Sequence, residues 1–363
     1  MNAKPLRLGL VGPMPPPNGG MAMQTQQLAR LLGAENIDVR RLATNAPYRP
    51  AVIGRVKGIR ALFRLVPYLW QVWCLAGRVD VIHVMANSGW SWQLYSSPVI
   101  WTGWLRRTPV IVNYRGGEAG SYLRKSFSRV KPTLDKASFV VVPSGFLEDV
   151  FAQFAVKTTV IPNIIDQERF KPESRAQARD SFNLIATRNL EPIYGLDTAI
   201  RAIGIARESI PDVRLKIAGS GPQRKELQAL VHDLDLEEHI EFVGRLGSTE
   251  IISLYQSADG LLNPATVDNM PNSLLEALAC GVPVISTDVG GVPYIVRHEH
   301  TALLVPPGDA QQMADAIMRL FADPELRKKL SSAGLAEVRQ YAWPEVRGQW
   351  LDLYNVAARG QVA

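Results

Sequence analysis

The feature that most constrains the fold is a repeated alternation of short apolar runs with segments of helical length. The first run, LRLGLVG, starts at Leu6 and leads through a Pro- and Gly-rich loop into the helical pattern MAMQTQQLARLLG, which Gly33 closes. Similar apolar, often β-branched runs follow at VDVIHVM, TPVIVNYRGG, ASFVVVPS and TTVIPN. Buried strands that alternate with helices form parallel sheets, so this half predicts a doubly wound α/β domain.

A second series of the same kind begins after a polar, charged stretch. Its apolar runs are FNLIATRN, DVRLKIAGSGP, IEFVGRL, ADGLLNPA, GVPVIST and TALLVPP. We therefore expect a hinge between Pro162 and Asp180 and two domains, over residues 1–170 and 171–344. Two such sheets can face each other across a cleft, with a nucleotide in one wall and a second substrate in the other.

Charge is divided unevenly between the two halves. Residues 1–171 hold 22 lysines and arginines against 9 acids, whereas residues 172–363 hold 18 against 25. This asymmetry indicates that the N-terminal half meets an anionic surface or substrate. Nucleic acid would also bind a basic patch, but the tryptophans here sit among aliphatic residues, which suits burial or lipid contact better. We expect no nucleic-acid partner.

The segment VIGRVKGIRALFRLVPYLWQVW indicates contact with a membrane surface. Lys57, Arg60 and Arg64 fall at helical spacing on one face. The apolar face holds Ile59, Leu62, Phe63, Val66 and Trp70. Six of the eight tryptophans lie between residues 70 and 104, which favours contact with anionic lipid headgroups. A core helix with a solvated charged face is the open alternative.

The expected location follows from three weaker observations. Cys74 and Cys280 are far apart in the sequence and suggest neither a disulfide framework nor a cysteine-based metal site. The first residues lack the apolar core of a signal peptide. The most apolar run, residues 65–77, has 13 residues, fewer than the roughly 18–20 of a spanning helix. We expect a cytoplasmic protein at the inner face of the cell membrane.

The stretch VDNMPNSLLEALACGVPVIST places Asp268 on a loop and Glu276 in a helix. A helix that begins near Asn272 or Ser273 would direct its N–H groups and positive dipole end at an anion such as phosphate. We expect that positive end to keep Glu276 ionised, so that its carboxylate accepts hydrogen bonds from vicinal ribose hydroxyls. Two alternatives stay open: acids that only complement a loop and a helix dipole, or a glycosidase couple.

This stretch resembles the acid-x7-Glu signature of the retaining GT-B glycosyltransferases of the glycosyltransferase family 4 type (group 1), with Asp268 where the first acid is usually Glu. KIAGSGPQRKEL, IEFVGRLGSTEIISLYQSADGLLNP and HTALLVPPGDAQQMADAI follow the family in order. The resemblance implies a GT-B fold, with two Rossmann-like doubly wound parallel-sheet domains facing across a cleft. It also implies a last helix at about 345–363 that packs back on the N-terminal domain.

The resemblance implies a donor site as well. Glu276 would bind the ribose hydroxyls, and Asp268 would hold the donor sugar and diphosphate together with the following loop. That loop consists of Asn269, Met270, Pro271, Asn272, Ser273 and Leu274. Arg188, in IATRNLEP, matches the arginine that neutralises the leaving diphosphate. A strand-end arginine paired with Glu191 is the alternative.

The N-terminal half contributes fewer candidates. Gly19 and Gly20 match the glycines that let a loop approach the donor phosphates, although a plain turn explains PNGG nearly as well. Arg115 stands where many members carry a histidine near the donor sugar, and could reach the phosphate or an acidic acceptor; a surface arginine is the alternative. His83, in DVIHVM, is either an acceptor-side or a structural histidine.

One departure concerns the diphosphate. The family usually has Lys-Gly downstream of the arginine, whereas this chain reads PIYGLD, with Tyr194 in place of the lysine. The resemblance implies no bound metal, no cofactor besides the nucleotide-sugar substrate, UDP- or GDP-linked, and retention of anomeric configuration.

We therefore expect an enzyme that transfers sugar to a hydroxyl of a lipid-linked or polysaccharide intermediate in cell-surface glycan biosynthesis. A nucleotide-sugar epimerase or hydrolase on the same fold, and a non-catalytic sugar-nucleotide-binding partner protein, remain alternatives. The replacements at Tyr194 and Arg115 motivate the second of these.

Overall fold

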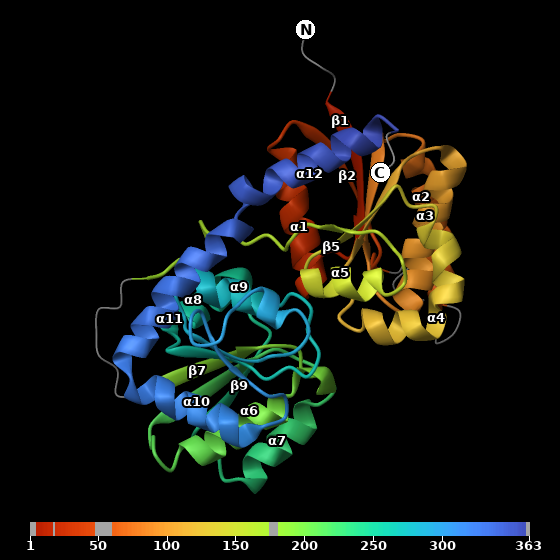
Figure 1. Ribbon diagram of the computed structural model, residues 1–363. Coiled ribbons are helices and arrows are strands. Elements are labelled where there is room, and N and C mark those ends of the chain that lie inside the picture. The colour runs from red at the N-terminus through yellow and green to blue at the C-terminus, as the bar shows by residue number, and fades with distance from the viewer. Residues whose placement is uncertain (1–4, 17–18, 48–59, 174–180, 361–363) are drawn as a thin grey trace. The chain divides into compact units, whose positions relative to one another are not determined.

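The computed structural model describes residues 5–16, 19–47, 60–173 and 181–360 (Figure 1). The chain divides into unit 1, residues 1–164 and 346–363, and unit 2, residues 165–345. Residues 165–170, which the sequence assigned to the first domain, thus belong to unit 2. The reason is local packing, because Ile165 forms a parallel bridge to Ala342 and Phe170 packs against Tyr255.

Unit 1 contains a parallel sheet, which in the described part of the chain has six strands in the order β2-β1-β3-β4-β5-β6. The strands are β1 (Leu6–Gly12), β2 (Ile37–Ala43), β3 (Val81–Ala86), β4 (Val110–Tyr114), β5 (Phe139–Val142) and β6 (Thr159–Val160). Sequence periodicity did not indicate β2, because this edge strand carries the charged residues Asp38, Arg40 and Arg41, all at least partly exposed.

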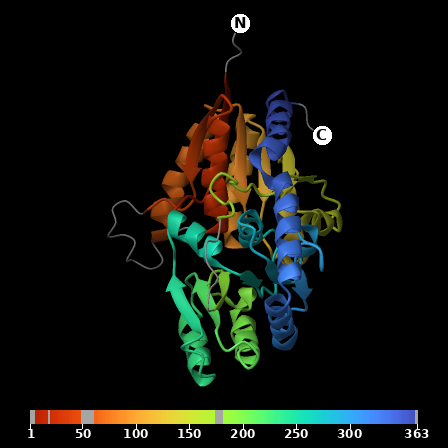
Figure 2. The ribbon, with the colours of Figure 1, turned by 90° about the vertical axis from the view of Figure 1, so that its left-hand side faces the viewer.

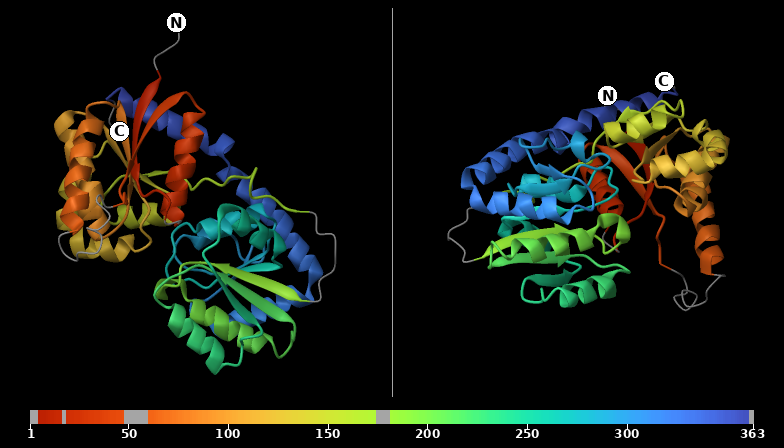
Figure 3. Two further views of the ribbon diagram at one scale, coloured as in Figure 1. Left: turned by 180° about the vertical axis from the view of Figure 1, so that it is seen from behind. Right: turned by 60° about the horizontal axis from the view of Figure 1, so that its bottom comes forward.

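Helices cover both faces of this sheet. They are α1 (Gly20–Gly33), α2 (Arg60–Ala76), η2 (Trp92–Ser96), α3 (Ser97–Arg106), α4 (Ala119–Leu134), α5 (Gly145–Ala152) and α12 (Trp343–Ala358). Figures 1 and 3 show α1 on one face and α2, α3 and α4 side by side on the other. Alternate strand residues such as Ile82, Val84 and Val112 form a core with Val72 of α2 and Ile100 of α3.

The last helix returns to unit 1. The start of β1 and the end of α12 lie at the same end of this unit (Figure 2). Trp350 of α12 is buried, with its ring centroid 4.8 Å from that of His83 on β3. Since Ile82 and Val84 face α2 and α3, His83 projects from the opposite face of the sheet, which α12 covers.

Unit 2 repeats the architecture. Among its described residues, six parallel strands run in the order β12-β11-β10-β7-β8-β9. The strands are β7 (Phe182–Thr187), β8 (Val213–Ala218), β9 (Ile240–Gly244), β10 (Gly260–Asn263), β11 (Val284–Thr287) and β12 (Leu303–Val305). The helices are η3 (Pro192–Tyr194), α6 (Leu196–Ala206), α7 (Arg224–Asp233), α8 (Ser248–Ser257), α9 (Asn272–Ala279), η4 (Val292–Tyr294), α10 (Ala310–Ala322), α11 (Pro324–Glu337) and η5 (Val338–Tyr341).

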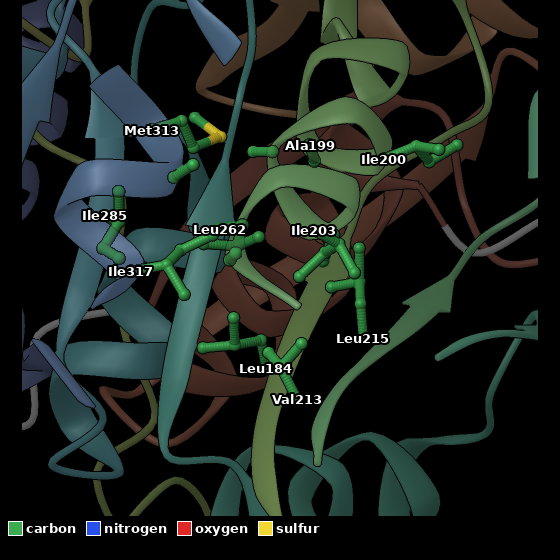
Figure 4. Packing of buried hydrophobic residues seen from close by; sticks show 14 of the residues in the cluster. Leu184, Ala199, Ile200, Ile203, Val213, Leu215, Leu262, Ile285, Met313 and Ile317 are labelled. Carbon is green, nitrogen blue, oxygen red and sulfur yellow. The ribbon is translucent and has the colours of Figure 1, made fainter. Parts of the chain in front are cut away.

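Aliphatic side chains fill the space between the unit 2 sheet and its helices. Leu184 and Leu262 from neighbouring strands meet Ile203 of α6 and Ile317 of α10 (Figure 4). Burying each such side chain contributes about 1.5–3 kcal/mol. A second core, which includes Leu274 of α9, fixes the position of that helix. No helix in the described ranges has the length and apolar character needed to cross a bilayer.

Candidate active site

A polar cluster lies where two neighbouring strands of unit 2 end. Because β7 and β10 are parallel neighbours, Arg188, directly after β7, lies beside Asn263, the last residue of β10. Arg188 donates to Asn263 Oδ1 through Nε at 2.9 Å and Nη2 at 2.7 Å. Asn263 Nδ2 in turn donates to Ser286 Oγ of β11 at 2.9 Å. These bonds fix the amide orientation and hold the guanidinium at the carboxyl edge of the sheet.

The same guanidinium forms an ion pair with Asp268. Both side chains are only 11% exposed, and the backbone N–H of Asn269 donates to Asp268 Oδ1 at 2.9 Å. Burial raises the pKa of Asp268, and the Arg188 charge opposes that shift. The Arg188 Cζ also lies 5.1 Å from the ring centroid of Tyr194, a cation–π distance. Asn263, Asp268 and Tyr194 thus hold Arg188.

The structure does not support the alternative pairing of Arg188 with Glu191. Glu191 Oε1 accepts from Asn189 Nδ2 at 3.2 Å, while Arg188 is bound by Asp268. Tyr194 stands where the resemblance led us to expect a lysine, and its ring packs against the guanidinium of Arg188. Burial raises the pKa of the Tyr194 hydroxyl.

Glu276 lies in α9, which begins at Asn272 as the sequence predicts. The cap position is Pro271, so Asn272 and Ser273 are the first helical residues and not capping side chains. Burial raises the pKa of Glu276 to about 7. This shift runs against the expectation that the positive helix end keeps the carboxyl ionised. Desolvation is its largest cause, and the hydrogen bond from Tyr255 and the charges of Arg188 and Arg169 oppose it.

A hydrogen-bond chain orients Glu276. Tyr255 Oη donates to Glu276 Oε2 at 2.8 Å and lies 2.6 Å from Thr187 Oγ1. Since the phenol has one proton and donates it to the carboxyl group, Thr187 donates to Tyr255. The chain runs from the end of β7 through α8 to α9, and it fixes one oxygen of the Glu276 carboxyl group.

The loop between Asp268 and Glu276 divides into core and polar parts. Met270 and Leu274 pack in the hydrophobic core, so their side chains support the loop and only their backbone is placed to contact a ligand. Asn269 and Pro271 are also buried. The Ser273 hydroxyl is buried and has no hydrogen-bond partner within the described residues. A buried hydroxyl of this kind, in the first turn of a helix, is suited to donate to an anion.

Two glycines allow close backbone approach around the cluster. A Cβ on Gly291 would overlap the carbonyl oxygen of Asn269, and the Gly291 N–H donates to the carbonyl oxygen of Asp268 at 3.1 Å. A Cβ on Gly219 would overlap the carbonyl oxygen of Arg188. Both glycines therefore set the position of the loops that carry the candidate catalytic residues.

The predicted glycines of unit 1 lie at the start of α1. Gly19 is the cap residue with an extended φ of −145°, its carbonyl accepts from Met23 N at 2.9 Å, and α1 begins at Gly20. A Cβ on Gly19 would meet no atom of the described residues within 4 Å. Within the described part of the chain, neither backbone conformation nor packing requires glycine at this position. The role of Gly19 and Gly20 toward a donor stays a prediction.

Arg115 follows β4 and belongs to a buried network, so it is not a simple surface arginine. It donates to Asn113 Oδ1 at 3.4 Å and to Asn163 Oδ1. Asn113 Nδ2 lies 3.1 Å from His83 Nε2, and His83 Nδ1 lies 2.8 Å from the Tyr354 hydroxyl of α12. The contact with Arg115 orients the Asn113 amide, so Asn113 donates to His83 Nε2 and His83 donates through Nδ1 to Tyr354.

His83 is a structural residue in this network. It is fully buried, and burial together with the Arg115 charge lowers its pKa to about 3. A neutral imidazole with a fixed tautomer links α12 to β4 and to Arg115. Within the described ranges, no three His, Cys, Asp or Glu side chains are grouped as metal ligands.

Three residues of the site were not predicted from the sequence, namely Thr187, Tyr255 and Asn263. Thr187 and Asn263 are each the last residue of a strand, and the carboxyl ends of parallel strands are where α/β proteins place ligands. That position was a usable signal for both. Tyr255 carries no such signal, because its contact with Glu276 depends on how α8 and α9 pack.

Family models match both parts of the chain. Residues 19–163 match a glycosyl transferase 4-like domain, and residues 167–336 match the model described as glycosyl transferases group 1. The chain belongs to the group 1 glycosyltransferases. The candidate residues Arg188, Asp268 and Glu276 all fall within the second match.

Two curated relatives of this group 1 glycosyltransferase are named as a glycosyltransferase and a mannosyltransferase. A D-inositol 3-phosphate glycosyltransferase of Saccharomonospora viridis is 31% identical over 215 residues, 55% of this chain and 50% of the relative. A GDP-mannose-dependent alpha-(1-6)-phosphatidylinositol monomannoside mannosyltransferase of Mycobacterium tuberculosis is 28% identical over 263 residues, 67% of this chain and 68% of the relative. The chain thus spans half the length of the first relative and about two thirds of the second.

Solved structures agree with the fold of this group 1 glycosyltransferase. Sucrose-phosphate synthase from Thermosynechococcus elongatus has a TM-score of 0.77 at 22% identity, covering 96% of this chain and 98% of that chain. HepE from Anabaena in complex with UDP has a TM-score of 0.75 at 19% identity, covering 96% and 99%. With its two parallel six-stranded sheets in the described residues, the chain has the GT-B fold.

Proposed function

We propose that the chain is a retaining glycosyltransferase that moves a sugar from a UDP- or GDP-linked donor to a hydroxyl acceptor. The observation that carries this proposal is the buried cluster at the ends of β7 and β10, where Arg188 lies between Asn263 and Asp268. A cation held at the carboxyl edge of the sheet is placed to bind a diphosphate. The mycobacterial relative is named as GDP-mannose-dependent, and the HepE structure contains UDP, which supports this donor class.

In the proposed reaction, the bond between the anomeric carbon and the diphosphate oxygen breaks, and the acceptor oxygen bonds to that carbon on the same face. The acceptor proton passes to the leaving diphosphate. Negative charge grows on the diphosphate as its bond breaks, and Arg188 stabilises it. Holding the acceptor beside the leaving group supplies much of the remaining rate enhancement, and no side chain is assigned as a general base.

The other residues of unit 2 receive binding roles. The Glu276 carboxylate accepts hydrogen bonds from the ribose hydroxyls, with Tyr255 fixing its orientation. The Ser273 hydroxyl donates to the diphosphate at the start of α9. Asp268 holds the donor sugar, and Tyr194 orients Arg188 without adding a second charge. The enzyme needs no metal ion in this proposal.

We propose a lipid-linked or polysaccharide intermediate of cell-surface glycan biosynthesis as the acceptor, and the inner face of the cell membrane as the place of reaction. The phosphatidylinositol monomannoside in the name of the mycobacterial relative supports a lipid acceptor. The excess of 22 basic over 9 acidic residues in residues 1–171 supports contact with an anionic surface.

Product analysis tests the proposal. The purified protein is incubated with UDP-glucose or GDP-mannose, with and without a bacterial lipid extract, and the anomeric configuration of any product is read by NMR. We expect an α-linked glycolipid from one of these α-linked donors, formed only when the extract is present. Free sugar or an epimerised nucleotide-sugar, formed equally without the extract, would instead identify a hydrolase or epimerase.

The substitution Arg188→Lys tests the assigned catalytic cation. Lysine keeps the charge but loses the planar, multi-donor geometry that Asn263 and Asp268 hold, so we expect kcat to fall by roughly 100-fold. Arg224→Lys on the exposed start of α7 is the matched control and should leave kcat unchanged. Equal kcat values in both variants would remove Arg188 from the mechanism.

A further inference from the structure

Helix α2 buries one stripe of side chains and exposes a second apolar stripe. Tyr68, Val72 and Ala76 are buried against the sheet. The exposed stripe consists of Phe63, Val66, Leu69, Trp70 and Trp73, with Val66 61% and Trp70 68% exposed. A surface helix ordinarily shows polar residues on the side away from the core. Contiguous exposed apolar side chains on a surface helix mark a site of interaction.

Sequence periodicity assigned Lys57, Arg60 and Arg64 to this helix. Lys57 and Ile59 lie outside the described residues, as do the side chains of Arg60 and Leu62, and Arg64 is half-buried. Neighbouring helices place described cations beside exposed tryptophans. Arg106 of α3 lies 4.7 Å from the ring centroid of Trp73, and Lys136, after α4, lies 4.5 Å from that of Trp104.

The outer surfaces of α2, α3 and α4 form one aromatic and basic face. Trp101 of α3 donates to Thr133 Oγ1 of α4 at 3.0 Å, which ties these two helices together. Trp104 and Leu105 at the end of α3 are exposed beside the stripe of α2. Figures 1 and 3 show the three helices next to one another on one side of the sheet. We call this surface the α2–α4 face.

Charge on the α2–α4 face is mostly positive. Residues 60–136 contain 11 lysines and arginines and three acids, and the sequences of α2, α3 and α4 contain no acid at all. Arg124, Lys125 and Arg129 of α4 are exposed, whereas Lys131 is paired with Asp135 at 2.7 Å. Cations beside exposed tryptophans match a partner that is apolar below an anionic surface.

We propose that the α2–α4 face docks unit 1 on an anionic lipid bilayer, with Phe63, Val66 and Trp70 inserted among the lipids and the α4 cations at the headgroups. The docking role rests on the proposed transfer to a lipid-linked acceptor, since it brings the enzyme to the surface that holds such an acceptor. Lateral insertion of one helix stripe needs no spanning segment.

A second copy of this chain fits the same face less well than an anionic bilayer does. A two-fold dimer would place the face against itself, and its unpaired cations would then meet cations. An anionic bilayer instead offers the opposite charge together with an apolar interior. The charge pattern therefore favours lipid over self-association.

Vesicle flotation of the full chain tests the proposal. We expect binding to vesicles of mixed phosphatidylcholine and phosphatidylglycerol, weak binding to phosphatidylcholine alone, and weakening with added salt. Arg124→Gln with Lys125→Gln should weaken binding to mixed vesicles by roughly 30-fold, given the usual gain per cation near an anionic surface. Arg224→Gln with Lys225→Gln, the same Arg-Lys pair on α7, is the matched control and should bind as wild type.

The apolar contribution to docking is tested with a second double variant and its matched control. Phe63→Ser with Trp70→Ser should abolish vesicle binding, whereas Tyr294→Ser with Phe321→Ser, which removes two exposed aromatic residues from unit 2, should not. UDP-glucose titration of each variant checks that its donor site is intact. Absence of nucleotide binding would contradict the proposed function. The vesicle result would still test docking independently of that function.

Three results would overturn the docking proposal. One is a wild-type chain that floats with neither vesicle type, and another is wild-type binding in both α2–α4 variants. The third is a wild-type dimer that Phe63→Ser with Trp70→Ser dissolves while vesicle binding persists, which would show that the face meets a second copy.

Discussion

Glu276 shows at the residue scale how burial sets the chemistry of this site. Its carboxyl group is fixed by Tyr255 and lies in the same cluster as Arg188, yet desolvation dominates and raises its pKa from 4.5 to about 7. A carboxyl group that changes charge near neutral pH is unusual for a residue assigned to bind hydroxyls. The proposed role therefore makes donor binding and stability depend on pH.

The pH dependence of stability follows from this pKa. Between about pH 4.5 and 7 the unfolded chain has lost the Glu276 proton while the folded chain keeps it, so the free energy of unfolding falls as pH rises through this window. The shift corresponds to about 3 kcal/mol. Urea unfolding at both ends of the window should show this loss in wild type and not in Glu276→Gln. Glu226→Gln on α7 should behave as wild type.

Donor affinity should change in the opposite direction. The ionised carboxylate accepts two hydroxyl hydrogen bonds, whereas the protonated form gives up part of that capacity. Calorimetric titration with UDP-glucose and GDP-mannose, whose diphosphate diesters keep their charge near neutral pH, should show tighter binding as pH rises through about 7. A Kd independent of pH in wild type would contradict the assignment of Glu276 to the ribose.

Tyr354 tests the network around Arg115. Tyr354→Phe removes the acceptor of the His83 Nδ1–H and leaves a buried donor unpaired, which should lower the free energy of unfolding by about 1–3 kcal/mol. If the network positions Arg115 for the reaction, the variant should also change kcat/KM while its affinity for UDP stays that of wild type. Tyr341→Phe, at a buried tyrosine of unit 2, is the control. An unchanged kcat/KM would show that the network contributes to stability and not to the positioning of Arg115 for the reaction.

At the element scale, the sequence predicts the repeated strands and helices but not the contacts that depend on how these elements pack together. Buried parallel strands such as β3 and β10 are continuous apolar runs, so both sheets could be anticipated, as could the start of α9. The edge strand β2 was hidden by its charged residues. The contact between Tyr255 and Glu276 depends on helix packing, and the pairing of Arg188 with Asp268 depends on loop geometry. Neither is encoded in spacing along the chain.

Gly291 provides a prediction for the loop that carries Asp268. Gly291→Ala would press a methyl group against the Asn269 carbonyl oxygen, so the loop must move and donor affinity should fall by about tenfold or more. Gly348→Ala on α12 is the matched control, because a methyl group there meets no atom of the described ranges within 4 Å and should stabilise the helix by about 0.5–1 kcal/mol. Calorimetry and thermal unfolding of both variants provide the comparison. Unchanged donor affinity in Gly291→Ala would show that the loop is not a donor contact.

At the scale of the whole molecule, the two units divide the proposed work. Unit 1 contains the basic and aromatic α2–α4 face and the network around Arg115, whereas unit 2 contains the cluster of Arg188, Asp268 and Glu276. The charge asymmetry of the sequence predicts an anionic partner for the N-terminal half, and the α2 segment was predicted to contact lipid. That α2, α3 and α4 share one face follows only from the packing of α2 on α3 and of α3 on α4.

Calorimetric titration of the purified chain with UDP, GDP and ADP tests the central claim, that unit 2 binds the nucleotide of a sugar donor, most directly. We predict that one of these nucleotides binds selectively, and that Glu276→Gln weakens its binding at pH 8 while Glu226→Gln does not. A ligand present at a hundredfold excess over its Kd should also raise the free energy of unfolding by about 2.7 kcal/mol. Absence of binding by all three nucleotides, or equal affinities in wild type and Glu276→Gln, would contradict the account.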